Sequence, residues 1–264
     1  MLNKSNPIGV MDSGIGGLTV VRELQRILPG EDIIYFGDSA NCPYGNKTAD
    51  QIFELSCHML QFLGSNGVKC TAVACNTIST MAERLRPCFD FRIISIVEEA
   101  AKYVIREKLS SVGLIGTEFT VASGKYAELI HQGNPDCHVV GKGSPLLAAL
   151  VDRGDFNQHD INLEITTQVD NILSREKVSD LILGCTHYPL LEGVIADFMG
   201  PEVTLIDSGA EAANLASTQF NPNDGPGGTR YYVSDDPAGF DRLAGLFLQE
   251  DVETNAGLVD ISRF

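Results

Sequence analysis

The sequence predicts an α/β fold of two pseudo-symmetric α/β domains, each a short parallel sheet flanked by helices, with a candidate active site in the interdomain cleft. Short β-branched runs alternate with helical patterns along the 264 residues, which is typical of parallel sheets covered by helices. Two pairs of segments also repeat in the same order: residues 8–13 are echoed by 112–117, and residues 72–77 by 181–187. The offsets are similar, 104 (112 − 8) and 110 (185 − 75 for the cysteines), which favours an internal duplication.

Each element follows from a local pattern. Apolar residues recur at helical spacing from Leu18 to Leu28, after the first strand. A capping-box pattern at 48–51 begins a second helix that ends near Gly64, and a further helix is predicted over 237–249. Strands are predicted over residues 8–11, 33–36, 71–74, 93–96, 112–115, 138–140, 180–183, 203–206 and 231–233.

The repeat also predicts the domain limits. The first domain is expected to combine residues 1–98 with 210–264, and the second to span 99–209. Residues 219–229 are rich in Gly, Pro and Asn, which predicts a loop. The last fifteen residues, 250–264, carry no clear pattern and are expected to form a tail.

Composition limits the classes of function. The net charge of −16 repels phosphate backbones, so we expect no nucleic-acid partner, and an anionic substrate would need a locally built site. The apolar runs are too short to cross a membrane, and the N-terminal residues lack a signal-peptide pattern. Seven irregularly spaced cysteines then indicate free thiols in a reducing compartment, and we expect a cytoplasmic protein.

Two cysteines occupy matching contexts. Cys75 and Cys185 each end an apolar run and precede small polar residues, where a strand gives way to a helix. Two thiols flanking one pocket could remove a proton from one face of a carbon and return one to the other, which is the chemistry of a cofactor-independent racemase. A helix N-terminus is expected to lower their pKa values. For Cys57, Cys70, Cys88 and Cys137 we expect the ordinary role of small buried hydrophobes.

Other interpretations of these motifs are weaker. The glycine-rich turn at 12–17 could bind a dinucleotide, but Thr19 stands where that motif needs a glycine. Cys185 and His187 could bind zinc, but no Cys-x-x-Cys pair exists. A thiol hydrolase would leave the second cysteine unexplained. Six strand-end residues are expected to converge on the cleft: Asp12, Asp38, Cys75, Thr117, Cys185 and Asp207.

Together these motifs resemble those of the glutamate racemases, within the aspartate/glutamate racemase superfamily. The resemblance covers roughly residues 8–248, and Asp-Ser-Gly-Ile-Gly-Gly and Cys-Thr-His-Tyr-Pro are its most specific segments. The matching segments, in family order, are 12–17, 37–40 with 43–45, 74–77, 115–117 with Thr120, Val121 and Ser123, and 183–189.

The resemblance implies interconversion of L- and D-glutamate without pyridoxal phosphate or metal, D-glutamate feeding peptidoglycan synthesis, and a homodimer. By analogy Cys75 acts on the D-isomer and Cys185 on the L-isomer. Asp152 stands near a position that the family fills with glutamate. The implied catalytic residues are Cys75, Cys185, Asp12, His187 and Asp152. The implied substrate-binding residues are Asp12, Ser13, Tyr44, Gly45, Asn76, Thr77, Thr186 and His187.

Three alternatives stay open at this stage. An aspartate racemase would share both cysteine motifs. A decarboxylase of the same superfamily would need only one of the two cysteines. An interaction protein that inhibits DNA gyrase through its acidic surface is a third, from a different class of function.

Overall fold

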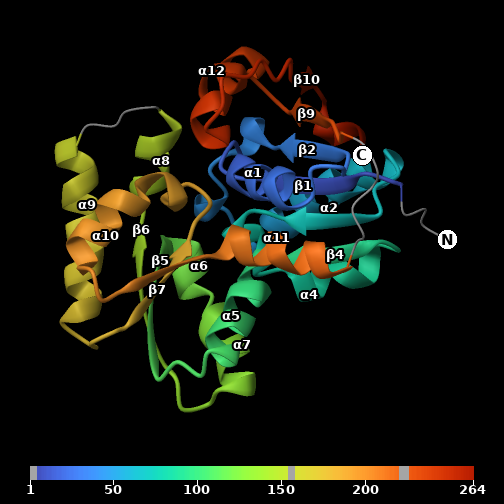
Figure 1. Ribbon diagram of the computed structural model, residues 1–264. Helices are drawn as coiled ribbons and strands as arrows, with labels where there is room; N and C mark the ends of the chain where they lie inside the picture. The colour runs from blue at the N-terminus through green and yellow to red at the C-terminus, as the bar shows by residue number, and fades with distance from the viewer. Residues whose placement is uncertain (1–4, 154–157, 220–225) are drawn as a thin grey trace.

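A computed structural model describes residues 5–153, 158–219 and 226–264, and Figure 1 shows them arranged as two lobes. Each lobe is built on one sheet, and every strand pair in both sheets is parallel. The predicted fold class of two α/β units is confirmed. No helix among these described residues is long and apolar enough to cross a membrane.

The first sheet has six strands in the order β10-β9-β2-β1-β3-β4. Side chains of β1 alternate between its two faces: Val10 packs with α1 in one core, while Met11 packs with α2 in another. The strands are β1 (Ile8–Asp12), β2 (Ile33–Gly37), β3 (Cys70–Val73), β4 (Arg92–Ser95), β9 (Thr229–Val233) and β10 (Gly257–Leu258). The helices of this lobe are α1 (Leu18–Ile27), α2 (Ala49–Ser65), α3 (Asn76–Ser79), α4 (Ala82–Leu85) and α12 (Pro237–Leu248).

The second sheet has four strands in the order β6-β5-β7-β8. They are β5 (Ser111–Thr117), β6 (His138–Ser144), β7 (Asp180–Gly184) and β8 (Thr204–Asp207). Its helices are α6 (Glu118–Ala122), α7 (Lys125–Gly133), α8 (Leu147–Asp152), α9 (Gln158–Leu173) and α10 (Glu192–Met199). The strands β2-β1-β3-β4 of the first sheet lie in the same relative order as β6-β5-β7-β8 of the second. By this match β1 corresponds to β5 and β3 corresponds to β7. This correspondence is the structural basis of the sequence repeat.

Two helices carry the chain between the sheets. α5 (Ile96–Arg106) leads from β4 to β5, α11 (Ser208–Gln219) leads from β8 to β9, and the two helices contact each other. The domain limits expected at 98/99 and 209/210 fall near the starts of these helices. The division into a domain of residues 1–98 plus 210–264 and a domain of residues 99–209 remains a proposal. Residues 1–4, 154–157 and 220–225 lie outside the described part of the chain. Most of the loop predicted at 219–229 lies outside it as well.

Local predictions mostly hold. The capping box is present, with Thr48 accepting from the Gln51 amide and the Gln51 side chain accepting from the Thr48 amide. The tail prediction for 250–264 is wrong, because β10 pairs with β9 and Phe264 meets the ring of Phe62 edge-on with centroids 5.4 Å apart. A two-residue strand has no period to detect in the sequence. It exists because β9 offers it a free edge.

The cysteines not assigned to the site divide into two kinds. Cys70 and Cys137 are buried, as expected. Cys88 is exposed and Cys57 only partly buried, so the expectation of a buried hydrophobe is wrong for Cys88 and incomplete for Cys57. The strand Cys70–Val73 buries its cysteine in the sheet, whereas Cys88 ends a short 3₁₀ turn at the surface.

Candidate active site

The two matched cysteines line one pocket between the sheets. Cys75 follows β3 and Cys185 follows β7, the corresponding strand of the other sheet. The cavity has a volume of about 70 Å³, on the scale where a single water occupies roughly 10–15 Å³. The site therefore suits a small molecule. Its walls are formed by Ser13, Cys42, Pro43, Tyr44, Gly45, Asn46, Cys75, Asn76, Thr77, Thr117, Glu118, Ser144, Pro145, Ala148, Ala149, Asp152, Cys185, Thr186 and His187.

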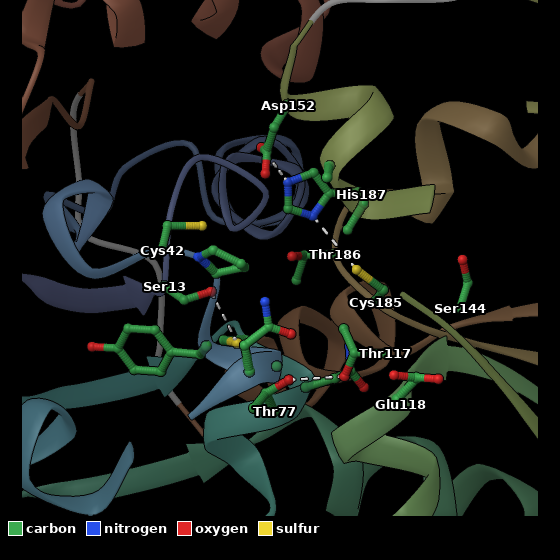
Figure 2. Close-up of a pocket in the computed structure, with 18 of the residues that line it drawn as sticks. Ser13, Cys42, Thr77, Thr117, Glu118, Ser144, Asp152, Cys185, Thr186 and His187 are labelled. Atoms are coloured by element: carbon green, nitrogen blue, oxygen red, sulfur yellow. Dashed lines mark hydrogen bonds and ion pairs between the residues drawn. The ribbon is translucent and has the colours of Figure 1, made fainter. Parts of the chain in front are cut away.

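Figure 2 shows a chain of three side chains along one wall of the pocket. The Sγ of Cys185 lies 3.5 Å from Nδ1 of His187, whose Nε2 lies 2.6 Å from a carboxylate oxygen of Asp152. Burial lowers the pKa of His187, but the charges of Asp152 and Cys185 outweigh it and raise that pKa well above its usual value. A protonated His187 places a positive charge next to the sulfur of Cys185.

Cys75 lies in a different environment. Its Sγ is 3.4 Å from the hydroxyl of Ser13, and Ser13 lies on the side of the pocket away from Cys185 in Figure 2. Burial and the nearby charge of Asp12 raise the pKa of Cys75 to about 12, so its thiol is protonated at neutral pH. The lowered pKa expected for Cys75 is therefore wrong: α3 has only four residues, and its Ile78 amide offsets little of the cost of burial.

Asp12 supports the site from behind the wall. Its side chain is 1% exposed and accepts hydrogen bonds from the Gly14 amide at 2.7 Å and the Thr186 hydroxyl at 3.2 Å. Burial raises the pKa of Asp12, against the lowering effect of His187. Asp12 is absent from the described lining residues, so it is placed to fix Thr186 and to act on the thiols by its charge.

Close packing of the glycine-rich turn brings the two cysteine loops together. A Cβ on Gly16 would lie 2.3 Å from Oγ1 of Thr186 and 2.6 Å from Cε1 of His187. Only a residue without a side chain fits there. The turn at 12–17 therefore acts as a contact surface for the 185–187 loop of the other sheet.

Hydroxyl and amide groups form the floor of the pocket. The hydroxyl oxygens of Thr77, in α3 of the first lobe, and Thr117, at the end of β5 in the second, are 3.1 Å apart. Figure 2 draws this hydrogen bond. The amide of Asn76 is held in place because its oxygen accepts from Tyr126 at 2.6 Å and its nitrogen donates to Ser208 at 3.3 Å. No Lys or Arg lines the pocket among the described residues, so an anionic substrate would be held by neutral donors.

Two predicted strand-end carboxylates have structural roles instead of converging on the pocket. Asp38 is buried, accepts from the hydroxyl of Tyr44 at 2.6 Å and from Ser234 at 2.6 Å, and so ties the binding loop to β9. Asp207 accepts from the Gly209 amide at 2.8 Å at the start of α11. Because the hydroxyl of Tyr44 is committed to Asp38, Tyr44 is unable to offer that hydroxyl to a substrate without breaking this bond.

Sequence reasoning missed several wall residues. Glu118 and Ser144 follow or end β5 and β6, so the strand-end rule that selected Thr117 could have found them. No comparable signal marks Ala148 and Ala149. Cys42, Asn46 and Pro145 likewise line the pocket without having been selected as site residues. Among the described residues no cluster of three or more His, Cys, Asp or Glu could hold a metal ion.

Comparison with known proteins confirms the resemblance read from the motifs. The family described as Asp/Glu/Hydantoin racemase matches residues 8–216. The chain is 39% identical over 249 residues to the glutamate racemase of Geobacter metallireducens, across 91% of this chain and 92% of that protein. A glutamate racemase isoform from Bacillus anthracis superposes with a TM-score of 0.92 at 31% identity, over 98% of both chains. A glutamate racemase from Francisella tularensis in complex with D-glutamate superposes with a TM-score of 0.90 at 34% identity, over 99% of this chain and 100% of that chain. The chain therefore belongs to the Asp/Glu/Hydantoin racemase family, and these relatives within it are glutamate racemases.

Proposed function

We propose that this chain racemises glutamate by two-base proton transfer between Cys75 and Cys185. The observation that carries the proposal is the pair of thiols from corresponding strands of the two sheets, both lining one small pocket. Glutamate is the proposed substrate because relatives at 31–39% identity are glutamate racemases, and the relative at 34% identity was solved with D-glutamate.

The two thiols start in different states. Cys75 is held protonated by burial and by Asp12. We take Cys185, which lies 3.5 Å from the His187 ring, as the thiolate of the resting enzyme. In this resting state Cys185 would take the α-proton from L-glutamate, and Cys75 would deliver its own proton to the opposite face. The products are D-glutamate, a Cys185 thiol and a Cys75 thiolate, and the reverse reaction uses the same groups with their roles exchanged.

Neutral donors would stabilise the intermediate carbanion. The α-proton of an amino acid is a very weak acid, so charge that moves onto the carboxylate must meet preorganised donors in a dry site. Ser13, Asn76 and Thr77 line the pocket and offer such donors. With the acid and the base both supplied by cysteines, the proposed reaction needs neither pyridoxal phosphate nor metal.

Three further parts of the proposal go beyond the site. A cytoplasmic location rests on the irregularly spaced cysteines, which indicate free thiols in a reducing compartment. A homodimer and the supply of D-glutamate for peptidoglycan synthesis rest on the family resemblance. Growth of a bacterial strain that requires external D-glutamate would test the last of these, because a functional gene copy should remove the requirement. Continued dependence on D-glutamate, with the protein expressed and folded, would contradict it.

Isotope transfer tests the mechanism directly. Purified protein dialysed against a chelator is given L-glutamate in deuterated water with no added cofactor, and optical rotation is followed. Early D-glutamate should carry deuterium at the α-carbon, because the thiol that delivers the proton has exchanged with solvent. Substantial retention of protium in the early product would instead indicate a single base. Turnover of aspartate but not glutamate would overturn the substrate while leaving the proton-transfer mechanism in place.

A further inference from the structure

One wall residue of the pocket is oriented from behind by two side chains outside the pocket wall. Asn76 lines the pocket and is 2% exposed. Its Oδ1 accepts a hydrogen bond from the hydroxyl of Tyr126 at 2.6 Å, and its Nδ2 donates one to the hydroxyl of Ser208 at 3.3 Å. Tyr126 and Ser208 are buried, and neither is among the described residues that line the pocket. A role for them in the reaction would therefore run through Asn76.

The hydrogens of this network fix which way the amide faces. The hydroxyl of Ser208 donates its single hydrogen to the carbonyl oxygen of Leu183 at 3.3 Å, so it can only accept from Asn76. The nitrogen of the amide must then face Ser208, and the oxygen must face Tyr126. One of the two amide hydrogens goes to Ser208. The second remains for a ligand in the pocket.

The partners of the amide come from outside the first sheet. Asn76 begins α3 of the first lobe, whereas Tyr126 belongs to α7 of the second lobe and Ser208 is the first residue of α11. Ser208 in turn contacts Leu183 of β7, two residues before Cys185. The network thus ties the start of α3 to the strand that leads to Cys185. The amide has its full set of partners only where the two lobes meet.

We propose that Tyr126 is a positioning residue for racemisation and acts through Asn76. By holding the amide oxygen, it directs the remaining N–H of Asn76 toward the substrate carboxylate on which negative charge develops. This inference rests on the proposed function, in which neutral donors stabilise that charge. A donor is most effective when it has no need to turn toward the charge during the reaction, and the contact with Tyr126 removes that need.

A tyrosine suits this position because it stays a neutral donor. Burial raises the pKa of Tyr126 above its usual value, so the hydroxyl keeps its hydrogen throughout the neutral range. Tyr126→Phe would keep the ring in the core and remove only the hydroxyl. The oxygen of Asn76 would then lack its donor, and the amide could turn this oxygen toward an anionic substrate.

The kinetics of Tyr126→Phe test the role directly. Complete loss of one preorganised donor slows an enzyme about 100- to 1,000-fold, and this variant keeps the donor but loses its orientation, so kcat should fall about 10- to 100-fold. KM should change much less, because the donor acts mainly on charge that develops after binding. In an Asn76→Ala background the same substitution should change kcat by no more than about twofold, since the group through which it acts is gone.

Tyr188→Phe is the matched control. The hydroxyl of Tyr188 is also buried, but it donates to the backbone carbonyl of Gly116, at 3.2 Å, instead of to Asn76. Its effect on kcat should be the same factor in the wild-type and Asn76→Ala backgrounds. Exchange of the α-hydrogen of glutamate with deuterated water, followed by proton NMR, measures turnover in the slow variants.

Exchange of the side-chain amide gives a readout that needs no turnover. The amide hydrogens of Asn76, identified in NMR spectra by their absence from Asn76→Ala, should exchange slowly with solvent in the wild type. In Tyr126→Phe they should exchange about two- to tenfold faster, as expected for the loss of one buried hydrogen bond. In Tyr188→Phe their exchange should stay as slow as in the wild type.

Three results would overturn the positioning role: unchanged amide exchange in Tyr126→Phe, an unchanged kcat in that variant, or a loss of kcat that persists in full in the Asn76→Ala background. Failure of the proposed function has a different signature. A wild type that racemises no glutamate but shows the slowly exchanging amide would contradict the proposed reaction and leave the orientation of Asn76 by Tyr126 in place.

Discussion

The hydrogen bond between Asp152 and His187 gives the sharpest test of how the Cys185 side of the pocket works. Asp152 lies 2.6 Å from His187 and is one of the two groups whose charge raises the histidine pKa, the other being Cys185. Asp152→Asn keeps the size of the side chain and removes its charge. We expect the variant to bind substrate nearly as well as the wild type but to turn it over more slowly, because the His187 imidazolium beside the proposed base Cys185 loses its charged partner.

The magnitude follows from the geometry. A charge-assisted hydrogen bond contributes about 1.5–3 kcal/mol, and each 1.36 kcal/mol on a barrier is a factor of ten in rate. The Asp152 side chain is 29% exposed, so solvent screening places the effect in the lower part of that range. We therefore expect kcat to fall about 10- to 50-fold. Because enantiomers have equal free energies, kcat/KM must fall by the same factor in both directions.

The pH profile adds an independent readout. The raised pKa of His187 means that its protonated form persists in the wild type above the usual histidine range, and is lost as pH rises through the raised value. Without the Asp152 charge this loss should occur at lower pH, so the alkaline limb of the kcat profile should move toward neutrality. Circular dichroism of both glutamate enantiomers across pH measures the effect.

Two control variants make the Asp152 result interpretable. Glu118→Gln removes another carboxylate from the pocket wall, one that is not a ring-nitrogen partner of His187, and it should change kcat much less. Asp152→Glu keeps the charge and should retain more activity than Asp152→Asn. Unchanged kinetics and an unchanged alkaline limb in Asp152→Asn would refute the argument that Asp152 acts through His187.

Three further predictions address the rest of the site. Cys75→Ala and Cys185→Ala should each keep the wild-type circular dichroism spectrum but lose about a thousandfold or more of racemisation, and near-normal turnover in either would contradict a two-base mechanism. Gly16→Ala should lower both Tm and kcat, because the new Cβ would lie 2.3 Å from a side-chain oxygen, whereas Gly193→Ala in α10, with no atom within 4 Å, should lower neither. Asp12→Asn should lower the pKa of Cys75, seen as thiolate absorbance appearing at lower pH, and an unshifted titration would exclude Asp12 as a cause.

The sequence by itself determined the architecture and most of the site. Apolar periodicity and turn residues act locally, so the strands, the main helices and the capping box at Thr48 could be predicted from neighbouring residues. The repeat located Cys75 and Cys185 at corresponding strand ends, and parallel sheets place such ends at one edge. Of the eleven residues that the resemblance implies for the site, all but Asp12 line the pocket, whereas Asp38 and Asp207, selected by the strand-end rule, do not.

The tertiary structure decided which side chains contact each other and how burial and neighbouring charges set their pKa values. Motif spacing gave no sign that the carboxylate of Asp38 would accept a hydrogen bond from the hydroxyl of Tyr44. It also predicted a low pKa for Cys75, because a helix start is visible in sequence whereas burial and a neighbouring carboxylate are not. Strand ends are local features, but desolvation and charge pairing are sums over the surrounding atoms, so only the folded chain determines them.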